Sequence, residues 1–359
     1  MELVLHLDHD CNLRCRYCYA GPKFSRRMSL EVARRAVDLA LDFAGGGFGL
    51  TFFGGEPLLA PSLVREVSDY ARQQCLQRRR PFLFRLVTNG TLLDADTVAW
   101  LVANRFDVQV SIDGTPAAHD RHRVFPDGSG SYAPAVAGLK RLLAAGADPL
   151  VLAVATPSNL DLLPESVAHL AGLGLRHVLV CDDATTRWDE AACALFEQQL
   201  RRVGDWYAGA LKAGSSFSLE PLAGLIARQA SGARATTCRF GDDLAVAPSG
   251  RIYPCTRLVR DDSDDAVCLG DVRTGIDRAK HAAMIAAARP VDEECAACEW
   301  EPRCNYSCAC AAYTLAGRFG AVTPVFCWMQ RCLMAEADRV GAMLAAEAPR
   351  TLQRCFGPG

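Results

Sequence analysis

The segment "HDCNLRCRYCYAG", residues 9–21, decides how the chain is interpreted, because three cysteines fall within eight of its residues. Cys11, Cys15 and Cys18 follow directly on a short apolar run at 2–8. A structural zinc site closes with four ligands, and disulfides need cysteines in pairs. Three thiolates on one loop can hold three irons of a cubane cluster and leave the fourth iron open. The spacing therefore favours an iron–sulfur cluster with a free coordination position, although short cysteine clusters also occur in zinc proteins.

The composition of the chain indicates a large cytoplasmic protein. It has 359 residues, of which 50% are hydrophobic, and its formal net charge is −2 with acidic and basic residues well mixed. We therefore expect a substantial core and no binding of nucleic acid or membrane. The sequence contains no signal segment and no apolar run of membrane-spanning length. Seventeen cysteines in a reducing compartment argue for bound metal rather than disulfides.

Residues 2–213 alternate strand-like and helix-like segments, which predicts βαβ units and a parallel sheet. The six strand candidates are 2–8, 48–53, 82–88, 107–113, 150–156 and 177–182. Amphipathic stretches between them include 29–43, 61–78, 132–145 and 162–173. This α/β pattern fits an open, partial (β/α)6 barrel or a doubly wound sheet. In both folds the functional site lies at the carboxyl ends of the strands.

Glycine-rich and polar motifs follow the candidate strands at that end. They include "GGE" after the second strand, "TNGT" after the third, "SIDG" after the fourth and "HDRHR" shortly afterwards. Glycines permit close backbone approach, and an arginine has forked donors that suit a carboxylate. Each motif alone is ordinary turn chemistry, but their recurrence at consecutive strand ends predicts one shared site. The candidate binding residues are Gly54, Gly55, Glu56, Asn89, Ser111, Asp113, Arg123 and Thr156.

A second cysteine-rich region lies between residues 238 and 332, with ten cysteines. Gly250 stands five residues before Cys255, and "APSGRIYPC" predicts a tight hairpin that presents this cysteine. A C-x2-C-x5-C-x3-C run follows. The cysteines of the pattern are Cys238, Cys255, Cys295, Cys298, Cys304, Cys308 and Cys327. A zinc-ribbon-like fold is the alternative, since C-x2-C pairs suit zinc.

The N-terminal triplet and the strand-end motifs resemble the radical SAM superfamily, and the seven C-terminal cysteines resemble its SPASM extension. The resemblance implies a partial (β/α)6 barrel and an open iron chelated by S-adenosylmethionine (SAM). Tyr17 is then placed near the adenine, and the Gly54–Glu56 segment near the SAM amino group. Asn89, Ser111 and Asp113 are implied as contacts of the SAM ribose and carboxylate. Arg123 is a further candidate for the carboxylate.

The SPASM resemblance implies two auxiliary clusters, and so three 4Fe–4S clusters in all. Cys238, Cys255 and Cys308 are assigned to the first auxiliary cluster. The second is assigned to Cys295, Cys298, Cys304 and Cys327. Sulfatase maturases take a fourth ligand for the first cluster from a cysteine six residues before the first SPASM cysteine. That position is Gly232 here, so the iron is either open or held by another residue, for which Cys268 is the leading candidate.

The resemblance also gives expected domain boundaries. We expect a radical SAM barrel over 1–215, a linker over 216–237, a SPASM domain over 238–332, and a helix with a tail over 333–359. The first strand candidate begins at residue 2, so no leader-binding domain is expected before it.

In the resembled family, one electron cleaves SAM and the resulting 5′-deoxyadenosyl radical abstracts a hydrogen from the substrate. The expected activity is that of a maturase forming a carbon–carbon or thioether cross-link in a ribosomally made peptide. The alternatives are sulfatase-maturase-like oxidation of Cys or Ser to formylglycine, dehydrogenation of a small molecule, and a non-catalytic zinc module. Sulfatase maturases typically carry an acidic residue after the second SPASM cysteine, where this chain has Thr256. Expected partners are the peptide and a one-electron reductant such as flavodoxin or ferredoxin. Either a separate leader-binding protein presents the peptide, or the barrel recognises it directly.

Overall fold

The computed structural model describes residues 1–43, 45–183, 186–235, 238–288, 295, 297–304 and 308–357. These residues divide into two compact units. The first unit contains Met1–Ser111, His122–Pro149 and Arg239–Ala288. The second contains Ile112–Arg121, Leu150–Cys238 and the described residues from 295 onward. Among the described residues, no helix combines the length and apolarity needed to cross a membrane.

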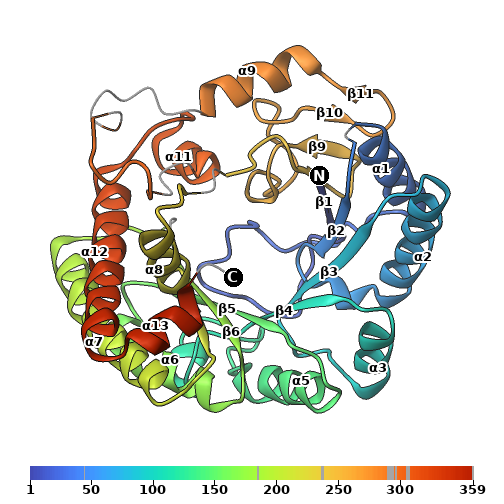
Figure 1. Ribbon diagram of the computed structural model, residues 1–359. Coiled ribbons are helices and arrows are strands. Elements are labelled where there is room, and N and C mark those ends of the chain that lie inside the picture. Colours follow the sequence, from blue (N-terminus) through green and yellow to red (C-terminus); the bar gives the residue numbers. More distant parts are fainter. Residues whose placement is uncertain are drawn as a thin grey trace. The chain divides into compact units, whose positions relative to one another are not determined.

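The sheet of the first unit has the strand order β11-β10-β9-β8-β1-β2-β3-β4 (Figure 1). Strands β1 to β4 are parallel, and β8 joins the other side of β1 in parallel as well. From β8 to β11 the neighbours are antiparallel. The strands are β1 (Glu2–His6), β2 (Phe48–Phe53), β3 (Phe82–Thr88), β4 (Asp107–Ser111), β8 (Leu244–Val246), β9 (Arg251–Tyr253), β10 (Gly270–Asp271) and β11 (Gly275–Ile276).

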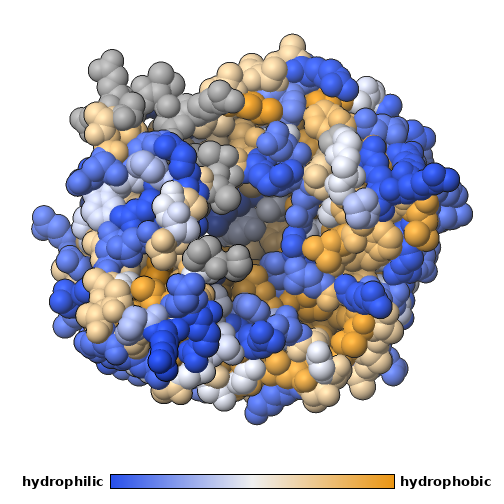
Figure 2. All heavy atoms as spheres, in the orientation of Figure 1, coloured by the Kyte–Doolittle hydropathy of each residue, from blue (hydrophilic) through white to orange (hydrophobic). Residues whose placement is uncertain are grey.

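One face of β1–β4 is covered by helices α1 (Leu30–Phe43), α2 (Pro61–Gln77) and α3 (Ala95–Ala103), which lie outside the strands in Figure 1. Leu3 and Leu5 lie two residues apart on β1, so their side chains share one face, and both are fully buried. The helices turn their apolar sides inward, and the surface above α1 and α2 is largely hydrophilic in Figure 2. Burial of this apolar face supplies the main stabilisation of the unit.

The opposite face of the same strands is polar near their amino ends. The Arg85 guanidinium on β3 pairs with Asp107 on β4 at 2.7 Å and with Glu2 on β1. Thr51 on β2 donates to the same Glu2 carboxylate. These side chains tie four neighbouring strands together on the face that carries His6 further along β1.

The second unit contains a parallel sheet of β5 (Leu150–Ala155), β6 (His177–Asp182) and β7 (Ser218–Glu220). Its long helices are α7 (Glu190–Lys212) and α12 (Pro324–Glu347), which pack against each other. The remaining described helices of this unit are α4 (Pro116–Asp120), α6 (Leu163–Gly172), α8 (Leu222–Ser231), α11 (Ala309–Ala316) and α13 (Pro349–Phe356). The first unit adds α5 (Tyr132–Ala144) and α9 (Arg278–Ala288).

All six predicted strands are present, so the prediction of an α/β fold with parallel strands is confirmed. The compact units do not follow the predicted boundary near 215, because 239–288 belongs with β1–β4. The C-terminal helix begins at Pro324 rather than near 333, which places Cys327 in its first turn. As a division into functional domains, the four predicted segments stay a prediction. Residues 44, 184–185, 236–237, 289–294, 296, 305–307 and 358–359 within them lie outside the described part.

Candidate cofactor-binding site

The triplet cysteines, Cys11, Cys15 and Cys18, lie on the loop that follows β1, at the carboxyl end of the sheet. None of the three is in a disulfide. Cys11 is buried, and the other two are half-buried. Burial raises the pKa of the Cys11 thiol to about 12, so binding of iron there has to displace a proton.

The loop is held from one side by the segment that contains Arg123. The backbone N–H of Arg14 donates to the Val124 carbonyl at 2.7 Å, and that of Arg16 donates to the His122 carbonyl at 3.1 Å. The Arg123 guanidinium lies 5.3 Å from the centre of the Tyr17 ring. Two predicted cofactor contacts, Tyr17 and Arg123, are thus neighbours beside the triplet.

The glycines after β2 hold the loop from the other side. The Gly55 N–H donates to the Asp8 carbonyl at 2.7 Å, and the Glu56 N–H donates to the Asp10 carbonyl at 3.1 Å. A Cβ on Gly55 would overlap the Asp10 carbonyl, and one on Gly54 would lie 2.8 Å from the Asp8 carbonyl oxygen. The close approach that these glycines permit is therefore to the triplet loop itself.

The Glu56 side chain organises the ends of β2 and β3. It is 1% exposed, and burial raises its pKa to about 6. One carboxylate oxygen accepts from the Thr88 hydroxyl at 2.7 Å and from the Leu58 N–H at 3.1 Å. The other accepts from the Asn89 N–H at 2.8 Å. A contact of this carboxylate with SAM stays a prediction.

Asn89 connects the end of β3 to the triplet loop. Its side-chain amide donates to the Asn12 carbonyl oxygen at 2.8 Å and lies 3.8 Å from the Cys11 sulfur. The Asn12 amide in turn donates to the Thr91 hydroxyl at 2.8 Å. Asn12 was not among the predicted site residues, although an amide side chain directly after the first triplet cysteine is a visible signal.

Three buried or half-buried side chains surround the same loop. The rings of His6 and His9 lie 4.8 Å apart, are each 1% exposed, and have no hydrogen-bond partner on any ring nitrogen among the described residues. The Lys23 ammonium donates to the Cys18 sulfur at 3.1 Å. Lys23 was missed because nothing in the sequence marks a lysine five residues beyond the last triplet cysteine.

The predicted residues Asp113 and Thr156 belong to the second compact unit. The Asp113 carboxylate accepts from the Val154 N–H at 3.0 Å, and the Thr156 N–H donates to the Asn159 side chain at 2.7 Å. Both side chains are buried, and the Asp113 carboxylate holds the backbone of β5. Ser111 ends β4 in the first unit and is half-buried. Their contacts with a cofactor stay predictions.

The C-terminal cysteines are distributed over both units. Cys255 follows β9, after the predicted hairpin with Gly250 at φ +100°, and Cys268 precedes β10; both belong to the first unit. The Cys268 thiol donates to the Gly270 carbonyl at 3.2 Å. The seven-cysteine pattern is otherwise in the second unit, where its described members are Cys238, Cys295, Cys298, Cys304, Cys308 and Cys327.

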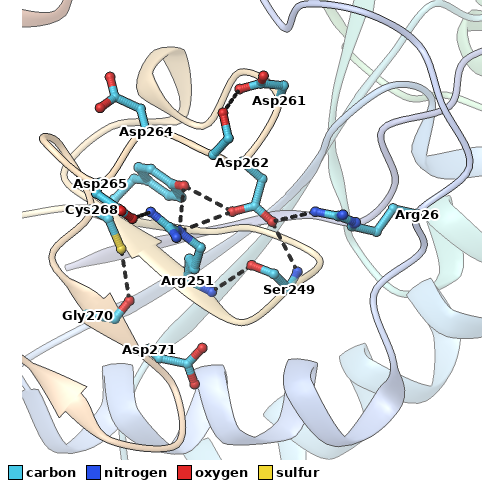
Figure 3. Close-up of polar contacts among 12 residues, drawn as sticks. Arg26, Ser249, Arg251, Asp261, Asp262, Asp264, Asp265, Cys268, Gly270 and Asp271 are labelled. Atoms are coloured by element: carbon cyan, nitrogen blue, oxygen red, sulfur yellow. Dashed lines mark hydrogen bonds and ion pairs between the residues drawn. The ribbon is translucent and has the colours of Figure 1, made fainter.

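A buried carboxylate fixes the loop between Cys255 and Cys268 (Figure 3). Asp262 accepts from the Tyr253 hydroxyl at 3.0 Å and lies 3.8 Å from the guanidinium groups of both Arg251 and Arg26. Arg26 belongs to the segment after the triplet. This network therefore anchors the loop that carries Cys268 to the chain that leaves the triplet.

In the second unit, Arg331 brings two predicted cluster ligands together. The Arg331 guanidinium lies 4.0 Å from the Cys298 sulfur, and Cys327 is one helical turn before it on α12. The thiols of Cys327 and Cys298 raise the pKa of Arg331. These two cysteines, assigned to one auxiliary cluster, thus lie near the same cation.

Within the described ranges, no three His, Cys, Asp or Glu side chains are arranged to hold a single metal ion. A cubane differs from a single ion, because each thiolate binds its own iron and the sulfurs do not converge on one point. The triplet fits such a cluster by its chemistry: three cysteines outside any disulfide share one loop, and residues at the ends of β2 and β3 hydrogen-bond to that loop.

Comparisons with known proteins agree with this site. Residues 9–180 match the Radical SAM superfamily. The chain is 24% identical over 338 residues to a cysteine-type anaerobic sulfatase-maturating enzyme of Clostridium perfringens, covering 85% of this chain and 88% of that protein. It is 27% identical over 332 residues to the mycofactocin maturase MftC of Mycobacterium ulcerans, covering 87% and 83%. In two further curated relatives the match spans only 60% and 39% of their length.

A solved structure has the same fold. Native anSMEcpe with bound AdoMet superposes with a TM-score of 0.82 at 19% identity, covering 96% of this chain and 99% of that chain. The α/β fold with its parallel strands is therefore that of a known SAM-binding enzyme structure. The expected family is confirmed for the part of the chain that carries the triplet and the strand-end motifs. Residues 9–180 are a radical SAM domain.

Proposed function

We propose that this protein is a radical SAM enzyme that cross-links a ribosomally made peptide by abstracting a hydrogen from one of its side chains. The observation that carries the proposal is the triplet loop, which places three cysteines in eight residues just after the carboxyl end of β1. A 4Fe–4S cluster and SAM supply the radical chemistry when bound there. The chain's own residues position that loop through Gly55, Glu56 and Asn89.

Several similar proteins support a peptide or protein as the substrate. By their names, two relatives that align over most of this chain are maturases. One solved structure of this fold holds a Cp18Cys peptide, and Streptococcus suis SuiB, at a TM-score of 0.57, holds the precursor peptide SuiA. Because these structures are at most 20% identical to this chain, they serve as support for the substrate class alone.

Thr256 favours a cross-link over formylglycine. It follows Cys255 directly, where sulfatase maturases have an acidic residue. Its hydroxyl is buried and makes no hydrogen bond to any described residue. A neutral hydroxyl is a very weak base, because its protonated form is strongly acidic, so it cannot replace a carboxylate base. Oxidation of a Cys or Ser side chain to formylglycine is the second candidate, because two of the relatives are sulfatase-maturating enzymes.

The full proposal includes two auxiliary clusters on the C-terminal cysteines and an external one-electron reductant. Three cubanes correspond to about twelve irons per chain. Anaerobic iron and sulfide analysis tests this number. Zinc as the dominant metal would remove the auxiliary clusters from the proposal and favour the zinc-module alternative.

The decisive experiment is mass spectrometry of a peptide after anaerobic reaction. A candidate precursor peptide is expected to lose two hydrogens, whereas a sulfatase-derived peptide would show its Cys thiol replaced by an aldehyde. The control is the protein with Cys11, Cys15 and Cys18 all changed to Ala. It is expected to make no 5′-deoxyadenosine while retaining its other iron, and undiminished SAM cleavage in it would refute the proposed function.

A further inference from the structure

Lys23 is a residue near the triplet to which the proposed function gives no role. It lies in the segment after the triplet and is half-buried. Its ammonium donates to the Cys18 sulfur at 3.1 Å and to the Gly21 carbonyl at 3.2 Å. Within the described part of the chain, it forms no ion pair with a carboxylate. Among the described residues, the Cys18 sulfur is therefore the one side-chain atom that accepts a hydrogen bond from the Lys23 ammonium.

The charge of Lys23 also acts on His6, which lies beside the same loop. Burial lowers the pKa of His6, and the charges of His9 and Lys23 lower it further. His6, whose pKa is about 3, is uncharged at neutral pH. The imidazole of His6 therefore adds no positive charge that could replace Lys23.

Other cations near the loop have different partners. The Arg14 guanidinium donates to the carbonyls of Cys11 and Leu13, and Arg123 lies over the Tyr17 ring. Lys23 differs from these arginine contacts in that its hydrogen bond goes directly to a triplet sulfur.

We propose that Lys23 is a positioning residue that raises the reduction potential of the cluster held by Cys11, Cys15 and Cys18, through its hydrogen bond to the Cys18 sulfur. This inference rests on the proposed function. One-electron reduction makes the cluster more negative, and a charge-assisted hydrogen bond to a ligand sulfur stabilises the reduced form. The electron comes from the external one-electron reductant, and no proton transfer is required.

The test is an EPR-monitored potentiometric titration of the anaerobically reconstituted protein. The signal that changes when SAM is added reports the triplet cluster and separates it from any other cluster. Lys23→Met keeps the length and apolar stem but removes the charge and the donors, and it is expected to lower the potential. A tenfold loss in the equilibrium for reduction corresponds to about 59 mV for one electron. Lys23→Arg should stay close to the wild type.

Lys140→Met is the matched control, because Lys140 is an exposed lysine on α5 in the same unit. It is expected to leave the potential unchanged. An unchanged potential in Lys23→Met with full iron content would overturn the inference. If Lys23→Met fails to retain the triplet iron, Lys23→Gln decides: a retained cluster with a lowered potential supports the inference. Loss of iron in both neutral variants overturns it, because Lys23 would then be needed for assembly.

The outcomes also separate this inference from the proposed function. A wild-type protein without any SAM-responsive cluster defeats the proposed function itself. A SAM-responsive cluster whose reduction potential is the same in the wild type and in Lys23→Met contradicts only the inference about Lys23.

Discussion

The buried carboxylate of Glu56 accepts a hydrogen bond from the backbone N–H of Asn89 at 2.8 Å, which joins the carboxyl ends of β2 and β3. Asn89 then reaches the triplet loop through Asn12 and lies beside Cys11. Glu56, which was expected to contact the cofactor, therefore also connects the ends of β2 and β3. Its replacement should change the positions of these strand ends and so affect the site.

Glu56→Ala is expected to destabilise the fold and weaken SAM binding without removing the iron held by the triplet cysteines. It leaves three buried donors without an acceptor, each costing about 1–3 kcal/mol, while relieving the burial of one charge. We expect a net loss of about 3 kcal/mol in the free energy of unfolding. Urea unfolding followed by tryptophan fluorescence measures this loss. The control Glu31→Ala, at a 72% exposed side chain on α1, should change little.

The pKa of Glu56 predicts a specific pH dependence of stability. Because its folded pKa of about 6 lies above the ordinary value of 4.5, its contribution is fully present below pH 4.5 and is lost as pH rises through 6. The difference between wild type and Glu56→Gln should therefore shift against the wild type by about 2 kcal/mol over this window. Unfolding curves of both proteins at pH 4.5, 5.5 and 7 measure it. A pH-independent difference would contradict the burial of an ionisable carboxyl.

Gly55→Ala is expected to abolish binding of the triplet cluster. Its Cβ would overlap the Asp10 carbonyl, which is backbone and cannot rotate away. The triplet loop must move, so the iron content should fall by about four per chain and SAM cleavage should stop. Gly172→Ala on α6 is the control, since nothing lies within 4 Å of its Cβ. Normal iron content in Gly55→Ala would show that the loop tolerates displacement.

Cys268→Ala tests the fourth ligand of the first auxiliary cluster. Cys268 precedes β10, which pairs with β9, and β9 leads directly to Cys255. If Cys268 closes that cluster, its loss should alter the EPR signal of the auxiliary clusters in protein whose triplet is replaced by alanine. Cys355→Ala, on α13 and outside the predicted cluster ligands, should leave the signal unchanged. An unaltered spectrum and iron content in Cys268→Ala would favour an open iron.

The strands and the location of the triplet were predictable because apolar runs of five to seven residues alternate with amphipathic helices. The start of α12 was also visible in the sequence. Thr323 caps the helix at its N-terminus, and Pro324 is its first residue, where proline is favoured. The prediction did not use that signal and placed the start of the helix at residue 333 instead of Pro324. Capping residues thus carried information that hydrophobic periodicity did not.

The roles of Gly55 and Lys23 were not predictable from the sequence. A glycine permits close approach, but tertiary structure decides whether the neighbour is a ligand or the Asp10 backbone. Lys23 reaches Cys18 through the path of the loop, which no local pattern encodes. Contacts of this kind depend on how the chain returns on itself.

The parallel pairing of β8 with β1 has a consequence for how separable the C-terminal half is. Leu3 pairs with Leu244, and the Asp243 carboxylate accepts the Glu2 N–H at 2.7 Å. A chain shortened before residue 239 would leave one side of β1 as a bare sheet edge, open to pairing with other molecules. The radical SAM domain is therefore not a module that can be excised: removing the later cysteines together with β8 should give aggregates instead of a smaller enzyme.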